Sequence, residues 1–246
     1  MTAPGAVRVV LPAYNEEASI ARVLERIAGA LSGRPHEVIV VDDGSADRTA
    51  VIVRDMAPGR PIHLLQHPAN LGLGPTLRDG LLAAARRSAA GDVVVTLDAD
   101  DTQPPEIIPG MASMIADGYD VVIASRYRPG ARALGVPRHR LLLSRGASWL
   151  FRLVLPIRGV RDFTCGFRAY RAEALKAALG DHGAGFFDQQ GFQAMVDVLL
   201  KLRGRGLRFG EVPLVLRYDE KGSASKMNVW RTTWQTLLLL LRRRLG

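Results

Sequence analysis

The sequence predicts an α/β fold, with a doubly wound, mostly parallel sheet and helices on both faces. Two observations support this prediction. Short apolar runs alternate with stretches whose apolar residues recur at helical spacing, and the connections between them are short. Several of the runs are apolar at every position, which is typical of parallel strands covered on both faces. The chain of 246 residues is long enough to bury a sizeable core in one large domain.

The expected strands and helices alternate through the first half of the chain. Asp47 could cap the second helix. Pro75 favours the start of the third helix, expected to end near Arg87, and Pro104 and Pro105 favour the start of the fourth. The expected strands are residues 7–11, 38–41, 62–65, 93–97 and 121–124, and the helical patterns cover about 20–31, 51–56, 75–87 and 107–115.

The second half of the chain has a different character. Residues 137–156 mix arginine with leucine and aromatic residues, which indicates an amphipathic basic segment. A strand is expected over 161–170, helices near 172–179 and 192–202, and a last strand over 209–218.

The end of the chain predicts an amphipathic C-terminal helix over residues 229–246, after a main domain over 1–228. Trp230, Trp234 and Leu237 share one helical face, and arginines 242–244 follow. This pattern is typical of a helix that lies on a membrane surface. Docking on a partner protein, on its own domain or on a second copy of the chain is the alternative.

The composition restricts the partners and the compartment. Lysine and arginine outnumber aspartate and glutamate by 33 to 24, for a net charge of +9, and the excess lies in the second half. This charge favours nucleic acid, an anionic membrane face or a substrate that carries phosphate. The single cysteine, Cys165, excludes a disulfide framework, fits a reducing compartment and is expected to be a small packed residue. The leucine run at 237–241 is too short to span a bilayer, and Glu16 and Glu17 do not suit a signal peptide. We therefore expect a cytoplasmic protein without a membrane span.

Acidic residues follow the expected strands at their carboxyl ends, where open α/β sheets bind ligands. Asp98 and Asp100, after the fourth strand, can reach a divalent cation and a sugar hydroxyl together, because Mg²⁺ is usually held by one or two carboxylates with phosphates and water. Asp43 follows the second strand, where a carboxylate can accept hydrogen bonds from a ribose or a base edge. The alternative for both sites is an ordinary solvated loop or a turn whose acids cap a helix.

Three segments taken together resemble the family 2 glycosyltransferases, which have the GT-A fold. They are Val-Leu-Pro-Ala-Tyr-Asn-Glu (10–16), Val-Val-Asp-Asp-Gly-Ser (40–45) and Leu-Asp-Ala-Asp (97–100). Four later segments are similar to the dolichyl or polyprenyl phosphate mannosyltransferase branch: Ala-Ser-Arg-Tyr (124–127), His-Arg-Leu-Leu-Leu-Ser-Arg-Gly-Ala (139–147), Arg-Asp-Phe-Thr-Cys-Gly-Phe-Arg-Ala-Tyr-Arg (161–171) and Ser-Lys-Met (225–227). The resemblance covers about residues 7–227 and implies that residues 1–228 form a GT-A catalytic domain.

The resemblance implies roles for individual residues. Asp100 would bind Mg²⁺ or Mn²⁺, and Gln103, one position later than in relatives, is the nearest match to a second metal ligand. Arg126 would meet the sugar phosphate, and Arg140 and Ser144, one helical turn apart, would bind the phosphate of a polyprenyl phosphate acceptor. The donor, a GDP- or UDP-hexose, would contact Pro12, Tyr14, Glu16, Val41, Asp43, Asp98, Ala99, Asp100 and Lys226, with Arg217 or Lys221 on its diphosphate.

Acceptor chemistry favours a lipid phosphate. A phosphate monoester is largely ionised near pH 7, with a second pKa of about 6, so it needs cations to place it rather than a general base. We therefore predict an inverting transfer of a hexose of the mannose or glucose type to polyprenyl or dolichyl phosphate, at the inner face of the membrane. A saccharide hydroxyl is the alternative acceptor, with Asp197 or Asp188 as base. A nucleic-acid-binding module is remote, because carboxylates repel a phosphate backbone.

Overall fold

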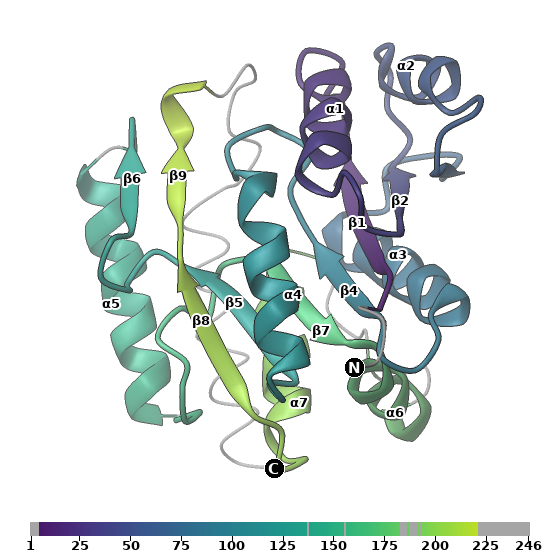
Figure 1. The fold of residues 1–246 in the computed structure, drawn as a ribbon. Coiled ribbons are helices and arrows are strands. Elements are labelled where there is room, and N and C mark those ends of the chain that lie inside the picture. Colours follow the sequence, from purple (N-terminus) through teal and green to yellow (C-terminus); the bar gives the residue numbers. More distant parts are fainter. Residues whose placement is uncertain are drawn as a thin grey trace.

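The computed structural model describes residues 5–136, 138–154, 156–182, 186, 191 and 193–220. Over these residues the chain forms a seven-stranded sheet in the order β3-β2-β1-β4-β7-β5-β8, with helices on both of its faces (Figure 1). All its strand pairs are parallel except those of β7, which runs antiparallel between β4 and β5. The strands are β1 (Val7–Ala13), β2 (His36–Asp42), β3 (Ile62–Gln66), β4 (Val93–Thr96), β5 (Val121–Ser125), β7 (Arg168–Arg171) and β8 (Phe209–Pro213). The predicted doubly wound, mostly parallel sheet is confirmed.

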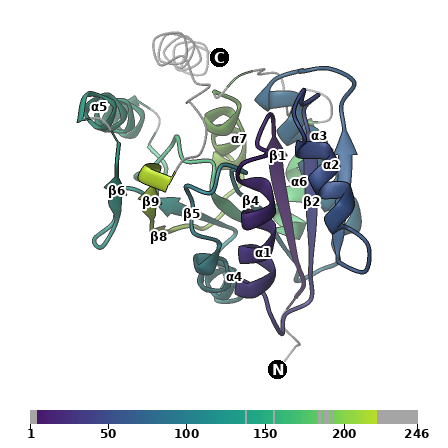
Figure 2. The same cartoon turned by 90° about the horizontal axis from the view of Figure 1, so that it is seen from above.

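Apolar periodicity directs the helices onto the sheet. In α1 (Ile20–Ala30) the buried residues Ile20, Val23, Leu24 and Ile27 lie along one face. Helices α1 and α4 lie on one side of the sheet, whereas α3, α6 and α7 gather on the other (Figure 2). Besides α1, these layers contain α2 (Thr49–Met56), α3 (Leu73–Arg87), the 3-10 turn η1 (Pro105–Ile107), α4 (Ile108–Ala116), α6 (Ala172–His182) and α7 (Gln193–Arg203).

A smaller layer lies beside the β8 edge of the sheet (Figure 1). Its strands β6 (Arg132–Leu134) and β9 (Val215–Arg217) pair in parallel, and the long helix α5 (Arg138–Val154) follows β6. Phe151 fixes α5 to the main domain, because its buried ring stacks on Phe163 with centroids 5.3 Å apart. The predicted amphipathic basic segment is therefore a helix.

The structure corrects the expected strand over residues 161–170. Only β7 forms, from Arg168, and residues 161–167 are a loop. The physical reason is that side chains, rather than a neighbouring strand, accept the amide protons of this segment. Glu211 Oε1 accepts from the amides of Arg161 and Asp162, and Asp162 Oδ1 accepts from those of Thr164 and Cys165.

The expected single strand over residues 209–218 is also wrong. The chain leaves the main sheet at Pro213, which ends β8, and enters the small sheet as β9 from Val215. Leu214 makes the transition, and its amide donates to the carbonyl of Ser125. A 3-10 turn η3 (Tyr218–Glu220) follows. A proline cannot donate to a sheet ladder, which suits the position where the strand leaves its sheet.

Some predictions fall outside the described residues. They concern Lys221, Lys226, Asp188 and the C-terminal helix over 229–246. Among the helices that the structure describes, none has the length and apolar character needed to cross a membrane.

Candidate active site

The carboxyl ends of the parallel strands β1, β2 and β4 meet at one edge of the sheet. Pro12 pairs with Val41, and the amide of Asp43 donates to the carbonyl of Ala13 at 2.8 Å. Ser19 joins the loop after β1 to the loop after β4, because its Oγ donates to the carbonyl of Ala99 at 2.9 Å and also contacts Glu16 Oε2 at 3.1 Å. The structure therefore brings the three segments of the predicted donor site together.

Hydrogen bonds within the loop after β4 hold its carboxylates in place. Asp100 Oδ1 accepts from the amide and the hydroxyl of Thr102, at 3.2 and 2.7 Å. Gln103 folds back onto Asp98: its Nε2 donates to Asp98 Oδ2 at 2.5 Å, and its Oε1 accepts from the amide of Asp98 at 3.1 Å. Asp98 and Asp100 are half-buried, whereas Gln103 is buried. This loop is ordered by its own side chains.

The carboxylate oxygens of this loop fit a hard divalent cation that takes most of its other ligands from a bound molecule and water. No group of three or more His, Cys, Asp or Glu that could hold a metal occurs among the described residues. Mg²⁺ that binds with a nucleotide commonly uses only one or two carboxylates, and phosphates and water complete its shell. Asp100 matches this pattern as a half-buried carboxylate. For Gln103 to act as a second metal ligand, its side chain would have to break its hydrogen bonds with Asp98, which involve both Oε1 and Nε2.

Asp43 organises the loop that precedes α3. Its Oδ1 accepts from the amide of Leu71, its Oδ2 accepts from the amide of Gly72, and both distances are 2.9 Å. His67 also lies against this carboxylate, with Nδ1 2.7 Å from Asp43 Oδ1, and its Nε2 lies 3.1 Å from Asp79 Oδ2. Gly44 permits the close packing of this loop, since its φ is +66° and a Cβ would lie 2.4 Å from the carbonyl carbon of Ala69.

The other predicted donor residues surround the same edge. Pro12 and Tyr14 are half-buried in and just after β1, and Val41 is fully buried in β2. Glu16 is buried, and its amide donates to Thr49 Oγ1 at 2.8 Å. Arg217 comes to the same place from β9, because its amide donates to the carbonyl of Thr102 at 2.8 Å, while its guanidinium pairs with Asp219 at 3.1 Å.

Arg126, which is half-buried at the end of β5, forms an ion pair with the fully buried Asp162. Its Nε and Nη2 donate to the two carboxylate oxygens of Asp162 at 2.8 and 2.7 Å, and its amide donates to Asp162 Oδ2 at 3.0 Å. Burial alone would raise the pKa of Asp162, but the Arg126 guanidinium outweighs burial and holds the pKa of Asp162 below its usual range. Burial also raises the pKa of the neighbouring Cys165 thiol to about 12, so this cysteine is a packed, unreactive residue, as predicted.

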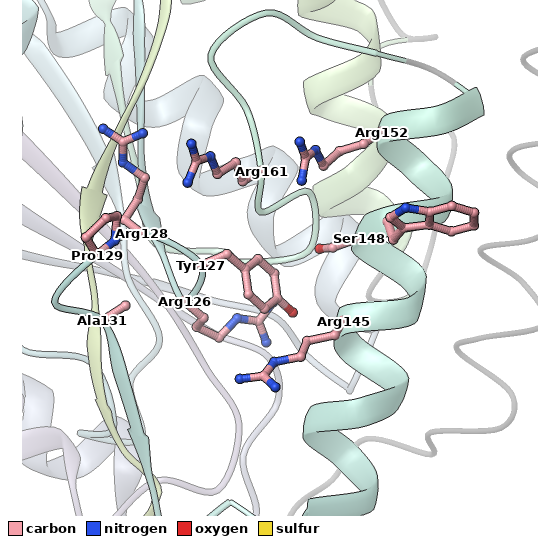
Figure 3. A pocket seen from close by; sticks show the side chains of 10 residues that line it. Arg126, Tyr127, Arg128, Pro129, Ala131, Arg145, Ser148, Arg152 and Arg161 are labelled. Carbon is pink, nitrogen blue, oxygen red and sulfur yellow. The ribbon is translucent and has the colours of Figure 1, made fainter.

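Several arginines line a pocket of about 590 Å³ between α5 and the segment after β5 (Figure 3). Arg145 and Arg152 come from α5 on one side, and Arg128 and Arg161 come from the other side. Ser148 contributes a buried hydroxyl to the lining, and its Oγ has no hydrogen-bond partner among the described residues. The remaining lining residues are Arg126, Tyr127, Pro129, Ala131 and Trp149. The pocket is strongly cationic and suits an anion.

The predicted acceptor residues lie on the helix that borders this pocket. Arg140 is in the first turns of α5, where its side chain is outside the described part. Ser144 Oγ lies 2.7 Å from the hydroxyl of Tyr127, which lines the pocket. Arg145, which was expected with Arg126 and Arg140 where the acceptor would enter, reaches into the pocket itself.

A single loop connects the arginine pocket to the carboxylates. At one end of residues 161–167, Asp162 holds Arg126. At the other end the carbonyl of Gly166 accepts from Thr96 Oγ1 at 2.6 Å, and a Cβ on Gly166 would lie 3.6 Å from Asp98 Oδ1. The 161–167 loop therefore links the two polar regions along the carboxyl edge of the sheet.

Asp197 lies in α7, away from solvent. Its side chain is 2% exposed and pairs with Lys201, one turn later, at 2.5 Å. Lys201 also donates to the carbonyl of Phe186 at 3.0 Å. Its proposed part as a base stays a prediction.

Sequence reasoning missed three carboxylates that build the site. Asp162 and Glu211 shape the 161–167 loop, and Asp101, at a positive φ of 59°, pairs with Arg22 and Arg26 of α1. Asp101 had a signal in the sequence, because it directly follows Asp100 at a strand end. Asp162 stood beside Arg161 in a quoted motif, but nothing local indicates that its partner is 36 residues away.

Residues 8–179 match the family described as Glycosyl transferase family 2, and the chain belongs to this family. A curated relative, dolichol-phosphate mannosyltransferase from Pyrococcus furiosus, is 32% identical over 219 residues, which cover 89% of this chain and 58% of that relative. Polyprenol monophosphomannose synthase from Mycolicibacterium smegmatis is 32% identical over 222 residues, 89% of this chain and 80% of that relative. The dolichyl-phosphate hexose transferase of Haloferax volcanii is 37% identical over 223 residues, with 89% and 86% covered. The resemblance expected from the motifs is confirmed.

Solved structures agree on the fold. Glucosyl-3-phosphoglycerate synthase from Mycobacterium tuberculosis, in complex with Mn²⁺, uridine diphosphate and glucosyl-3-phosphoglycerate, superposes with a TM-score of 0.68 at 24% identity. The superposition covers 97% of this chain and 80% of that one. The expected GT-A fold is therefore confirmed for the described domain.

Proposed function

We propose that the chain transfers a hexose from a nucleoside diphosphate sugar to a polyprenyl phosphate. The observation that carries the proposal is that the 161–167 loop joins the carboxylate loop to the arginine-lined pocket. Relatives named for transfer to dolichol phosphate and polyprenol support the acceptor class. A GDP- or UDP-hexose of the mannose or glucose type is the proposed donor.

The carboxylate side would bind the donor. Asp43 and the ordered loop before α3 would receive the nucleoside, with Tyr14 and Glu16 at its border. Asp100 would hold Mg²⁺ or Mn²⁺ against the diphosphate, and the cation would stabilise the charge that develops on the leaving nucleoside diphosphate. Structural relatives solved with Mn²⁺ or Mg²⁺ and uridine diphosphate support this use of a metal.

The arginine side would place the acceptor. Two anions must approach one another for the transfer, and guanidinium groups offset their repulsion while fixing the geometry of a phosphate. Arg145 and Arg161 line the pocket, and Ser148 Oγ offers a buried hydroxyl to a phosphate oxygen. Because the acceptor is already ionised, no residue has to remove a proton from it. The configuration at the transferred carbon of the sugar would invert in a single displacement.

A saccharide hydroxyl is the alternative acceptor, with Asp197 as the base. Removing a proton needs a carboxylate within hydrogen-bond reach of the hydroxyl. Asp197 is paired with Lys201 and almost fully buried, which favours a structural part instead. Replacement by Asn therefore separates the two functions: Asp197→Asn would abolish transfer to a hydroxyl, whereas transfer to a phosphate would continue in a correctly folded variant.

The proposed place of action is the inner face of a membrane, where a polyprenyl phosphate is embedded. Residues 229–246 would contribute as an amphipathic helix on the membrane surface or on a membrane partner protein, after a catalytic domain over 1–228. The acidic strand ends argue against nucleic acid as a partner.

The decisive test combines donor identification with a transfer assay. Thermal unfolding with a panel of nucleoside diphosphates and Mn²⁺ would name the donor, because a ligand of the native state raises the melting temperature. Sugar labelled in that donor is then incubated with polyprenyl phosphate and extracted. Label in the organic phase, dependent on Mg²⁺ or Mn²⁺, is the expected result. Label that remains wholly aqueous while the donor is consumed contradicts the lipid acceptor.

A further inference from the structure

Asp101 has an uncommon backbone conformation directly after Asp100. Its φ of 59° lies in the left-handed region, which residues with a side chain seldom adopt, although aspartate tolerates it better than most. Its side chain is 1% exposed, so the carboxylate is turned into the protein. Such a conformation persists where the surrounding contacts determine it, and a buried carboxylate needs charged or hydrogen-bonding partners.

Two arginines of α1 supply these contacts. Arg22 and Arg26 lie one helical turn apart, on the same face of the helix. Arg22 Nε pairs with Asp101 Oδ2, and Arg26 Nη1 donates to Asp101 Oδ1 at 2.5 Å. Arg26 is itself held by Glu106 of η1, because its Nε and Nη2 donate to the two oxygens of that carboxylate at 3.0 and 2.8 Å. Both oxygens of Asp101 are therefore fixed to one helix.

Helix α1 also holds the residue before Asp100. Ser19, at the N-terminal end of α1, donates from Oγ to the carbonyl of Ala99 at 2.9 Å. Asp100 thus lies between two neighbours that are attached to the same helix, Ala99 through its backbone and Asp101 through its side chain. Because each attachment is only one residue away, the backbone of Asp100 has little freedom to move relative to α1.

We infer that Asp101 is a positioning residue, which Arg22 and Arg26 hold so that the turn presents Asp100 to the metal and diphosphate before either arrives. A group that is ordered in advance avoids a loss of conformational freedom on binding. This inference rests on the donor part of the proposed function. An ion pair that served stability alone would affect the melting temperature and not the affinity for metal and nucleotide.

Asp101→Asn removes the charge and keeps the shape. Asparagine also tolerates the left-handed region, so the backbone preference is retained. The variant should fold, since Arg22 is 55% exposed and can be solvated, while Arg26 keeps both hydrogen bonds to Glu106. In the chain without ligands, hydrogen exchange of the amides of residues 97–103 should become several-fold faster than in the native chain.

Titration calorimetry with Mn²⁺ and either guanosine or uridine diphosphate measures the consequence. Asp101→Asn should weaken metal-dependent binding about tenfold, the cost of ordering one or two side chains on association. Binding of the same nucleotide without metal, in the presence of a chelator, should not change, because Asp101 acts through the metal ligand. Arg22→Gln should reproduce both effects to a smaller extent. Arg60→Gln removes the same charge from an exposed pair with Glu25 of α1 and is the matched control.

A second substitution separates the side chain from the backbone. Asp101→Gly adopts a left-handed φ without strain but has no carboxylate, so it should behave like Asp101→Asn. Native exchange and native metal-dependent affinity in Asp101→Gly would show that the backbone conformation alone suffices, which overturns the inference. Unchanged exchange or unchanged affinity in both Asp101→Asn and Arg22→Gln overturns it as well. An equal loss of affinity with and without metal also does so, because it indicates a general loosening of the fold.

These outcomes are distinct from those that test the proposed function. Metal-dependent nucleotide binding by the native chain, without label in the organic phase, rejects the lipid acceptor and leaves this inference in place. Native binding and transfer together with native affinity in the Asp101 variants do the reverse. A native chain that binds neither nucleotide with Mn²⁺ rejects the proposed donor and this inference together.

Discussion

The two sides of the proposed site are held in opposite ways. On the carboxylate side, Asp43 and Asp100 accept hydrogen bonds from amides and hydroxyls of their own loops. On the arginine side, Arg126 is fixed by Asp162, but within the described residues no carboxylate pairs with Arg128, Arg145, Arg152 or Arg161. The carboxylate side is thus ordered before any ligand arrives, whereas these four arginines have no carboxylate partner in the part of the chain that the structure describes.

This contrast follows from what each side would recognise. A nucleoside has a fixed shape, and binding it to ordered groups avoids the loss of side-chain freedom on association. A phosphate is small and can be met by arginines that adjust to it. The following substitutions test that division.

The largest effect is expected where the arginine side is rigid. Asp162→Asn removes the fully buried carboxylate that pairs with Arg126, whose side chain is 20% exposed, and this should lower the free energy of unfolding by about 3–5 kcal/mol at pH 7. Urea unfolding measures it. The pKa of Asp162 is lowered by folding, so the contribution is present above the unfolded value of about 3.9 and is lost as pH falls through the folded pKa.

The control for this substitution removes both charges. Arg126→Gln combined with Asp162→Asn should recover part of the lost stability, because no unpaired charge remains. A loss below about 1 kcal/mol in the single variant would show that Arg126 is well solvated there.

The second largest effect is expected for Asp100. Asp100→Ala should reduce metal-dependent transfer about 10²–10³-fold with an unchanged melting temperature, since it removes an electrostatic contact to the metal and diphosphate. Steady-state rates over a range of Mn²⁺ concentrations measure it. Asp117→Ala, an exposed aspartate at the end of α4, is the matched control. Native rates in Asp100→Ala would remove this residue from the chemistry.

An intermediate effect is expected for His67, which links Asp43 to Asp79. His67→Ala should raise the KM for the donor about tenfold or more and change kcat less, because a hydrogen bond to a charged group contributes about 1.5–3 kcal/mol. His63 lies in β3, just before His67, and has no contact with Asp43 in the described part of the chain, so His63→Ala is the control. A fall in kcat alone would place the effect outside donor binding.

A smaller effect is expected from the adjustable arginines. Arg145→Gln or Arg161→Gln should each raise the KM for the polyprenyl phosphate several-fold to about tenfold and leave the KM for the donor unchanged. The salt dependence of the acceptor KM should decrease as well. Arg54→Gln on α2 controls for overall charge. A donor KM that rises equally would contradict the division of the site.

The smallest effect concerns Glu211, whose pKa is raised mainly by burial. Gln can still accept from the amides of Arg161 and Asp162, but it carries no charge. Since the unfolded chain releases this proton first, the native chain loses stability as pH rises from about 4.3 through the folded pKa. Glu211→Gln should therefore be more stable at neutral pH, by less than about 1 kcal/mol. Urea unfolding at pH 4 and pH 7 tests this, and a stability difference that is the same at both contradicts it.

Much of the carboxylate side could be predicted from the sequence, because strand ends and neighbouring acids are local features. Asp98 directly follows an expected strand and Asp43 comes one residue after another, and parallel strands must bring such positions to one edge. The arginine side could be predicted only in outline. The partner of Arg126 is 36 residues away, and the 161–167 segment has the composition of a strand while side chains hold it as a loop. The position of a residue in the sequence does not show which side chains accept the amide protons that a neighbouring strand would otherwise bind.

The antiparallel strand β7 also determines the spacing of the site. It separates β4, which leads to Asp98, from β5, which leads to Arg126, so these strands lie two strand intervals apart, or about 10 Å. Because hydrogen-bonded backbone sets this interval, substitution of side chains would not widen or narrow it. An enzyme with this strand order would change its sugar specificity through its side chains alone, because the distance between β4 and β5 stays constant.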